Sequence, residues 1–349
     1  MPKGAALACR IAIISATSPT NMNIAINGFG RIGRQALRII LEQHPTMHVV
    51  LINDLTDDKT LKHLFQFDST YRTYNNPKAF DGVTMTAEKD PTKLPHRDLK
   101  VDVVLECTGV FRKREDAALH LKGGAKKVII SAPAKGNVDG TFCMGVNEKT
   151  YNSRKMDVLS NASCTTNCLA PMAKVLHENF KIQQGFMTTI HSYTNDQQLL
   201  DLPHKDLRRA RAAAINMVPT STGAATAVGL VLPELAGKLD GMAIRVPTPT
   251  GSITDLTVVV TKKTDAEAVN AAFKKAAKGP MKGILGYEER ELVLSDFIGD
   301  SRSAIIDAPS TKVHTEKGVT IVKVIAWYDN EWGYSNRLVE LAKLVGSKL

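Results

Sequence analysis

A cysteine at the predicted start of a helix is the residue with the clearest chemical potential in this sequence. Residues 157–160 resemble a short strand, and apolar residues then recur at helical spacing, so a helix is predicted to begin near Cys164. Ser163 and the hydroxyl residues after it suit the cap of such a helix. Because the helix dipole favours a thiolate there, we expect a lowered pKa and a nucleophilic Cys164. Spacing alone leaves an inert, buried thiol as the alternative.

A glycine-rich loop near the beginning of the chain suggests a dinucleotide site. Gly28-x-Gly30-x-x-Gly33 follows a predicted strand and opens a predicted helix, where bare backbone can approach a pyrophosphate. Asp54 ends the next predicted strand and can accept hydrogen bonds from an adenosine ribose. Its negative charge would repel a 2′-phosphate, so the pattern favours NAD over NADP.

His191 is the candidate base. A histidine that ends an apolar strand, residues 186–190, is by itself more often structural than catalytic. Together with Cys164 it could form a pair that generates thiolate and moves protons near neutral pH.

Several segments in order resemble the phosphorylating glyceraldehyde-3-phosphate dehydrogenase family. The resemblance runs from Met22 to the C-terminus and is carried by residues 27–34, 163–171, 189–194, 221–225, 245–249 and 327–337. It implies that Cys164 attacks an aldehyde and that His191 accepts the hydroxyl proton as hydride leaves for NAD. Inorganic phosphate then attacks the thioester and releases an acyl phosphate. The resemblance also implies that the backbone N–H of Cys164 and protonated His191 stabilise the oxyanion. Cys168 follows one helical turn later and points elsewhere, so we expect it to serve packing.

The resemblance further implies two sets of binding residues. Those for NAD are Asn27, Gly28, Phe29, Gly30, Arg31, Ile32, Gly33, Asp54, Thr108, Ser131, Asn330 and Tyr334. Leu55 and Leu202-Pro203 resemble the NAD-dependent branch of the family. Those for the substrate phosphate and inorganic phosphate are Ser163, Thr165, Thr194, Arg211, Thr222, Gly223 and Arg245, with Asp196 expected to orient Arg245. The family's homotetramer is implied as well, with residues 193–215 lining the interface. Pro95-His96 departs from the family's more common Pro-Trp.

The order of elements predicts an α/β fold with two parts. Apolar strands alternate with helices up to Cys164, as in a Rossmann-type doubly wound parallel sheet. Long β-branched runs after it, at residues 252–261 and 319–327, suggest an α+β catalytic domain with a mixed or antiparallel sheet. We therefore expect an NAD-binding domain from residues 22–163 and 330–349, and a catalytic domain from residues 164–329.

Composition fits an intracellular enzyme that handles phosphorylated molecules. The chain has 349 residues, 43% of them hydrophobic, and a net charge of +10. Its five cysteines show neither a disulfide framework nor metal-ligand spacing, so we expect reduced thiols, no metal and a cytoplasmic location. No apolar run is long enough to predict a membrane span. Residues 1–21 are interpreted as an N-terminal extension, disordered or wrongly assigned, with a targeting peptide as the less favoured reading.

Two other functions remain as alternatives. The first is the sister enzyme that oxidises erythrose 4-phosphate, which shares Cys164 and His191. Thr222-Gly223-Ala224-Ala225 keeps the phosphate-binding pattern that the sister enzyme typically alters. The second is a basic nucleic-acid-binding protein, but no RNA-recognition motif supports it, so nucleic acid is expected only as a secondary partner.

Overall fold

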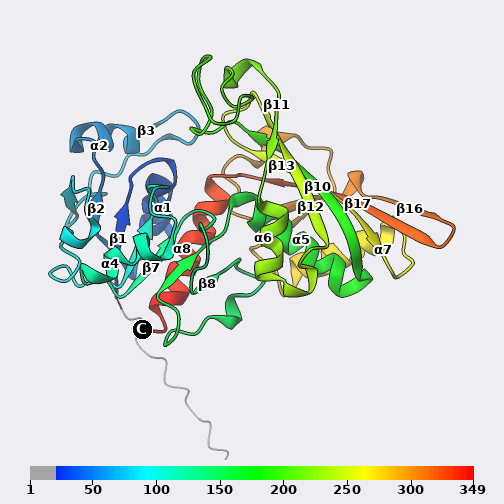
Figure 1. Cartoon of the computed structure of the whole chain (residues 1–349), viewed down its shortest axis with the longest axis horizontal. Helices are drawn as coiled ribbons and strands as arrows, with labels where there is room; N and C mark the ends of the chain where they lie inside the picture. Colours follow the sequence, from blue (N-terminus) through cyan, green and yellow to red (C-terminus); the bar gives the residue numbers. More distant parts are fainter. Residues whose placement is uncertain (1–20) are drawn as a thin grey trace, which may run out of the picture.

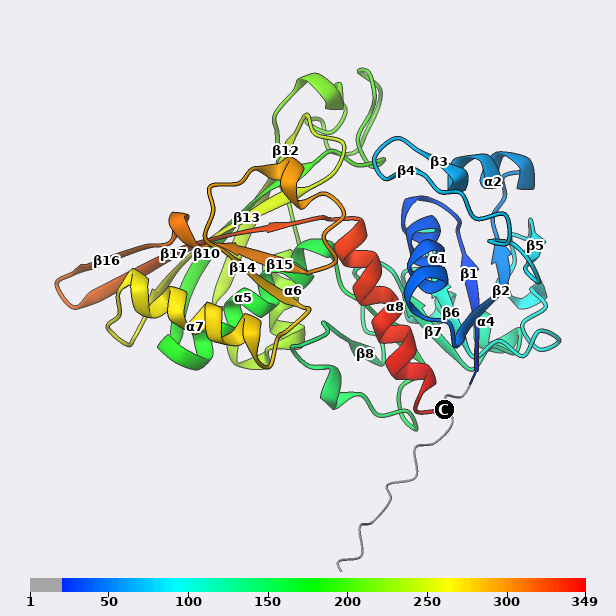
Figure 2. The same cartoon turned by 180° about the vertical axis from the view of Figure 1, so that it is seen from behind.

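The structure is a computed structural model that describes residues 21–349, so the predicted extension lies almost entirely outside the described residues. Two β-sheets lie side by side, with helix α8 between them (Figures 1 and 2). The helices are α1 (Arg31–Gln43), α2 (Asp58–Gln66), α3 (Arg114–Ala117), α4 (Leu119–Lys122), α5 (Cys164–Phe180), α6 (Ala224–Val231), α7 (Ala266–Lys278) and α8 (Trp332–Gly346).

The first sheet is entirely parallel, as the alternation of strands and helices predicted. Its strand order is β5-β2-β1-β6-β7-β9-β8. The strands are β1 (Met22–Asn27), β2 (Met47–Asn53), β5 (Thr84–Thr86), β6 (Val103–Glu106), β7 (Lys127–Ile130), β8 (Gly140–Thr141) and β9 (Val158–Ser160), and a separate hairpin pairs β3 (Phe67–Asp68) with β4 (Arg72–Thr73). The chain moves from β1 to one side through β2 and returns to the other side at β6. This reversal creates a crevice at the carboxyl ends of β1 and β6, the usual ligand position in such sheets.

Helix α8 brings the end of the chain back to the first sheet. Leu338, Leu341 and Val345 of α8 are fully buried in one apolar cluster with Ile24 of β1 and Leu37 of α1. Helix α8, at the end of the chain, is therefore part of the core of the first sheet.

The second sheet is mixed, also as predicted. Its main order is β11-β12-β10-β13-β17-β15-β14, and β16 pairs with β17. Only the pairs β10–β12 and β14–β15 are parallel. The strands are β10 (Ile182–Ser192), β11 (Val218–Ser221), β12 (Leu239–Val246), β13 (Ser252–Val260), β14 (Leu285–Glu288), β15 (Ala304–Asp307), β16 (Lys312–Glu316) and β17 (Val319–Tyr328).

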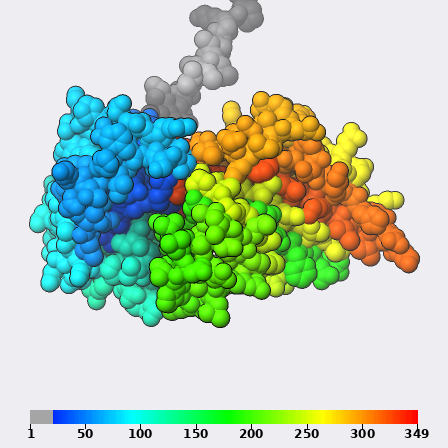
Figure 3. All heavy atoms as spheres, turned by 90° about the horizontal axis from the view of Figure 1, so that it is seen from above, coloured from blue at the N-terminus to red at the C-terminus, as the bar shows by residue number. Residues whose placement is uncertain are grey.

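One face of the second sheet is covered by helices α5, α6 and α7, which share an apolar core with its strands. Residues 193–217, between β10 and β11, rise as loops above the sheet in Figure 1, and their green atoms face the viewer in Figure 3. Within residues 21–349, none of the helices has both the length and the apolar character needed to cross a bilayer.

The chain after β6 forms two short helices, α3 and α4, and not one continuous helix. The break falls at Ala118, whose ψ of −11° departs from regular α-helical geometry. The division does not affect the first sheet, because β6 and β7 pair directly.

The packing of α8 gives a test of its role in the first core. We expect Leu341→Ala to lower the free energy of unfolding by about 2–5 kcal/mol, because it removes buried methyl groups and leaves a cavity. Lys343→Ala, an exposed change on the same helix, should alter it by less than about 0.5 kcal/mol. Urea unfolding followed by circular dichroism measures both. Equal effects of the two substitutions would show that α8 is not part of this core.

Candidate active site

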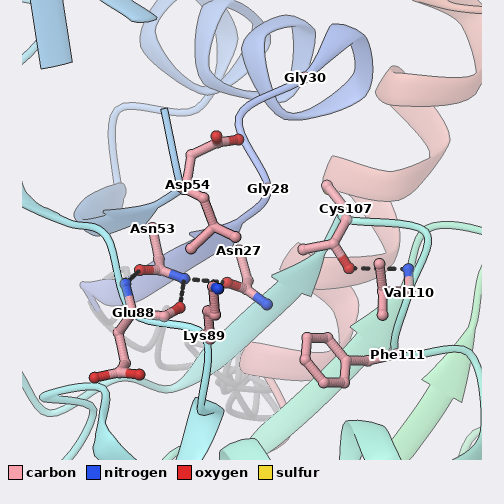
Figure 4. A pocket seen from close by; sticks show the side chains of 12 residues that line it. Asn27, Gly28, Gly30, Asn53, Asp54, Glu88, Lys89, Cys107, Val110 and Phe111 are labelled. Carbon is pink, nitrogen blue, oxygen red and sulfur yellow. Dashed lines mark hydrogen bonds between the residues drawn. The ribbon is translucent and has the colours of Figure 1, made fainter. Parts of the chain in front are cut away.

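A cavity of about 440 Å³ lies at the carboxyl ends of β1, β2 and β6. Figure 4 shows Asn27, Asn53, Asp54 and Phe111 around it, together with the glycine loop. The cavity therefore occupies the crevice that the strand order creates. Predicted NAD residues Asn27, Gly28, Gly30, Asp54 and Thr108 all line it.

The three glycines of the loop have different roles. Gly28 has φ +90°, and a Cβ there would lie 2.6 Å from the backbone nitrogen of Thr108. A Cβ on Gly33 would lie 2.3 Å from the carbonyl oxygen of Gly28. Beside Gly30, in contrast, a Cβ would meet no atom within 4 Å, so this position opens toward the cavity. Two glycines thus allow close packing, and the third leaves room for a ligand at the start of α1.

Asp54 holds the glycine loop in place. Its Oδ2 accepts from the Phe29 backbone N–H at 2.8 Å, and its Oδ1 accepts from the Thr56 N–H at 3.0 Å. The side chain of Phe29 is fully buried, so only its backbone can serve a ligand. The position of Asp54 just after β2 agrees with the sequence-based expectation for a ribose-binding carboxylate.

Two of the other residues predicted to bind NAD, Asn330 and Arg31, are held by contacts within the protein. The Asn330 Oδ1 accepts from the hydroxyls of Ser192 and Ser252 at 2.9 and 3.1 Å. This orientation leaves the amide N–H₂ of Asn330 as its free donor, which suits a carboxamide ligand. The Arg31 side chain instead pairs with Asp68 and Glu331.

The other NAD residues are mostly enclosed by the protein. The Tyr334 hydroxyl donates to the Ala162 carbonyl at 3.1 Å. The Ser131 backbone N–H donates to the Glu106 carbonyl at 2.9 Å. Ile32 lies in the first turn of α1 and packs against the first apolar core. The glycine backbone, Asp54 and the oriented Asn330 amide fit a dinucleotide that spans both sheets.

Cys164 is the first residue of α5, as predicted, and its thiol meets His191. The Ser163 hydroxyl caps the helix by accepting from the Thr166 N–H at 2.9 Å. The Sγ of Cys164 lies 3.4 Å from the Nε2 of His191, near the end of β10. The Nδ1 of His191 lies 2.8 Å from the Ser192 carbonyl. Nδ1 also lies 2.8 Å from Nη1 of Arg245, which can only donate, so the tautomer depends on which of the two contacts is a hydrogen bond. In the tautomer in which Nδ1–H donates to the Ser192 carbonyl, the Nε2 lone pair faces the thiol and can accept its proton.

The expected low thiol pKa is not what the surroundings produce. Burial raises the pKa of Cys164, although the nearby Arg245 guanidinium and the Thr165 hydroxyl oppose this change. Burial, with Arg245 as the second cause, lowers the pKa of His191 to about 3. Both effects favour the neutral forms of the pair, the thiol and the neutral imidazole. The helix dipole considered alone was therefore an incomplete basis for the sequence-based prediction.

Arg245 reaches the catalytic pair from β12. Its Nη1 lies 2.8 Å from the Nδ1 of His191 and donates to the Ser192 carbonyl at 2.9 Å. Its Nε is buried and has no hydrogen-bond partner among the described residues. Such a donor is costly to leave unpaired, so the site is suited to an anionic ligand.

The other predicted phosphate residues lie at element ends. Gly223 caps the start of α6, and the Thr222 hydroxyl accepts from the Ala224 N–H at 3.2 Å. Thr194 follows the end of β10. The Thr165 hydroxyl, in contrast, lies 3.0 Å from the Tyr328 hydroxyl and is buried.

Two expectations about the basic loop need correction. The Arg211 side chain is 65% exposed and pairs with Asp201, so the structure does not bring it to the catalytic pair. Arg209 is only 19% exposed, donates to Thr220 at 2.9 Å, and is close enough to Arg245 to lower its pKa. Asp196 pairs with Arg209 and not with Arg245. Spacing could not distinguish the two arginines, because both stand in one run and the directions of their side chains depend on how the loop folds.

Sequence reasoning also missed the residues that support the site. Tyr328 lies within hydrogen-bond distance of Thr165 and Thr189, and Ser192 and Ser252 orient Asn330. Tyr328 and Ser192 lie within the recognised segments beside Asn330 and His191, and this adjacency was the available signal. Among the side chains of residues 21–349, no group of three or more His, Cys, Asp or Glu is arranged to hold a metal ion.

The opposing effects on Cys164 can be tested by alkylation of the ligand-free protein. Arg245→Gln removes the charge that lowers the thiol pKa, so we expect roughly three- to tenfold slower iodoacetamide alkylation at neutral pH. His191 should stay neutral, since burial remains. Peptide mapping separates Cys164 from Cys107, whose pKa burial raises to about 12. Arg211→Gln is the matched control and should leave the rate unchanged. Unchanged or faster alkylation of Arg245→Gln would contradict the assigned influence of Arg245.

Comparison with known proteins shows the family to which this chain belongs. Residues 22–114 match the family model for the NAD binding domain of glyceraldehyde 3-phosphate dehydrogenase, and residues 163–330 match the model for its C-terminal domain. Glyceraldehyde-3-phosphate dehydrogenase of Geobacillus stearothermophilus is 55% identical over 336 residues, which cover 94% of this chain and 99% of that protein. Glyceraldehyde-3-phosphate dehydrogenase 1 of Bacillus cereus is 57% identical over 334 residues, covering 93% and 98%. The chain belongs to the glyceraldehyde-3-phosphate dehydrogenase family of NAD-dependent oxidoreductases.

Proposed function

We propose that the protein converts D-glyceraldehyde 3-phosphate, NAD and inorganic phosphate into 1,3-bisphosphoglycerate and NADH, through a thioester on Cys164. The 3.4 Å contact between the Cys164 thiol and the His191 imidazole is the observation that carries the proposal. A nucleophile beside a base suits covalent catalysis of acyl transfer. Members of the family with over half their residues identical carry the corresponding name.

The first half of the reaction makes the thioester. As Sγ bonds to the aldehyde carbon, its proton passes to Nε2 of His191, so the neutral pair can act without a preformed thiolate. The backbone N–H of Cys164 and the protonated imidazole stabilise the oxyanion, which then takes the proton from Nε2 to give the hemithioacetal and a neutral His191. Bound NAD supplies the hydride acceptor, and the residues that hold it are those around the glycine loop, with Asn330 and Tyr334 at the nicotinamide end. His191 takes the hydroxyl proton as the hemithioacetal is oxidised.

The second half releases the product. An oxygen of inorganic phosphate bonds to the acyl carbon, and the bond from that carbon to Sγ breaks. The proton on His191 passes to the sulfur, which restores the thiol, and the proton of the attacking hydrogen phosphate is released to solvent. Arg245 and Thr194 are assigned to the phosphate of the substrate, which the unpaired Nε of Arg245 supports. The attacking phosphate is assigned to Thr222, Gly223, Ser163 and Thr165. Arg209, in place of the predicted Arg211, is assigned to the position between the two phosphates.

The protein is further proposed to act as a cytoplasmic homotetramer. The loop of residues 193–217 exposes large apolar side chains to an unusual degree: Leu199, Leu200, Leu207, Ile215 and Met217 are each 70–81% exposed. Clustered apolar exposure of this kind favours a contact with another subunit.

The domain boundaries also remain a proposal. We place the NAD-binding domain at residues 22–163 and 330–349 and the catalytic domain at residues 164–329. The separate apolar clusters around the two sheets support this division.

The overall reaction can be tested by following NADH absorbance. We expect NADH formation from glyceraldehyde 3-phosphate to need inorganic phosphate, and erythrose 4-phosphate to be a much poorer substrate. Cys164→Ser should lower turnover by roughly 10³-fold or more, because a serine hydroxyl is a far weaker nucleophile here, while NAD binding persists. Preference for erythrose 4-phosphate, or full activity without phosphate, would refute the proposed reaction.

The two phosphate roles can be separated by rapid-mixing kinetics. Thr222→Ala should keep a fast first burst of NADH and then turn over roughly tenfold more slowly, because phosphate attack is impaired. Arg245→Gln should instead lose the burst and raise the KM for the aldehyde, because the substrate is poorly positioned. If Thr222→Ala lost the burst and Arg245→Gln kept it, the two assignments would have to be exchanged.

A further inference from the structure

The floor of the dinucleotide cavity is a continuous buried hydrogen-bond network. It joins the last residues of three adjacent parallel strands: Asn53 of β2, Asn27 of β1 and Glu106 of β6. Asn53 Nδ2 donates to Asn27 Oδ1 at 2.7 Å, and Asn27 Nδ2 donates to Glu106 Oε2 at 2.6 Å. Figure 4 shows Asn53 and Asn27 directed at each other beneath the cavity.

The Glu106 carboxylate is the point where the network meets the cavity wall. Its Oε1 accepts from the backbone N–H of Thr108 at 2.8 Å and also from the Thr108 hydroxyl. Thr108 lines the cavity and is the residue against which Gly28 packs. The direction of the Glu106 carboxylate therefore fixes both Asn27, which directly precedes Gly28, and the Thr108 backbone, against which Gly28 packs.

Glu106 is only 1% exposed, and a buried carboxylate needs a partner. Among residues 21–349, His120 of α4 is the basic side chain that lies within 4.0 Å of it, with Nε2 at 3.1 Å from Oε2. His120 is itself fully buried. Its Nε2–H thus completes the set of donors to the carboxylate.

A second histidine fixes the direction of the first. His96 Nε2 lies 2.9 Å from His120 Nδ1, and His96 is also fully buried. Burial, with His120 as the second cause, lowers the pKa of His96 to about 4, so its imidazole is neutral at pH 7. The Nδ1 of His96 has no partner among the described residues, which favours placing the proton on Nε2. His96 then donates to His120 Nδ1, and His120 must donate from Nε2 to Glu106.

We propose that His120 is a positioning residue for the NAD site: supported by His96, it holds the Glu106 carboxylate in the orientation that fixes Asn27 and Thr108 around the cavity. His120 does not line the cavity, so it acts through residues that do: through Glu106 on Thr108, and on Asn27, whose Nδ2 lies 3.3 Å from His120 Nε2. The role concerns dinucleotide affinity and is independent of the aldehyde chemistry proposed above.

Two amide substitutions at position 120 distinguish this role from simple filling of space. The amide nitrogen of glutamine can take the place of Nε2, whereas that of asparagine reaches only the place of Nδ1. We therefore expect His120→Asn to raise the Kd of NAD roughly tenfold, and His120→Gln to keep it within about twofold. The Kd is measured by calorimetry on the ligand-free protein, with thermal unfolding recorded for each variant.

Kinetics and a second position complete the test. In His120→Asn, kcat at saturating NAD and the KM for glyceraldehyde 3-phosphate should change by less than about twofold. His96→Phe keeps a ring but removes the donor to His120, and should weaken NAD binding by roughly threefold. If His120→Asn does not fold, His96→Phe tests the positioning role of His120 in its place. The proposal is overturned if the variant that folds binds NAD like the wild type, or if His120→Gln is as impaired as His120→Asn.

Discussion

The Tyr328 hydroxyl is the contact on which the catalytic arrangement depends. It lies 3.0 Å from the Thr165 hydroxyl of α5 and 2.8 Å from the Thr189 hydroxyl of β10, so one group at the end of β17 links the two elements that carry the reactive pair. Cys164 is one residue before Thr165, and His191 is two residues after Thr189. The Tyr328 side chain is 1% exposed. Hydrogen bonds at such a buried position are strong, and a polar group that loses its partner there costs free energy of folding. The separation of sulfur and imidazole is therefore set by contacts between secondary-structure elements that are distant in sequence.

The same strand also connects the two halves of the molecule. After Tyr328 the chain passes through Asn330, whose amide is oriented by hydroxyls from β10 and β13, and enters α8, which packs into the core of the first sheet. The first sheet presents its own groups at the carboxyl ends of β1, β2 and β6. A dinucleotide held by that sheet thus meets the thiol because β17 and α8 form one continuous segment between the two sheets.

Patterns local in sequence predicted much of this organisation. The glycine loop, the helix that begins at Cys164, the parallel sheet and the C-terminal helix each have a signal within a few residues, so each could be inferred before the fold was known. The side-chain directions in the loop of residues 193–217 could not be inferred in this way. Arg209 and Arg211 stand two residues apart, yet one is enclosed by Asp196 and Thr220 and the other pairs with Asp201 in solvent. That difference arises from how residues 193–217 fold against β11, which no spacing rule encodes. The contacts of the buried histidines are equally nonlocal. His96 contacts His120, 24 residues later, and His120 contacts Glu106 at the end of β6.

The pKa of Cys164 shows why position in a helix is not enough to predict reactivity. The dipole of α5 and the charge of Arg245 favour a thiolate, but closing the site around the sulfur removes the water that would solvate it. With His191 also held neutral by burial, charge separation is unfavourable until a reacting carbonyl accepts the sulfur. The arrangement thus couples deprotonation of the thiol to bond formation, since Nε2 already faces Sγ. The proton acceptor and the arginine are thus both in place around the sulfur before the substrate arrives.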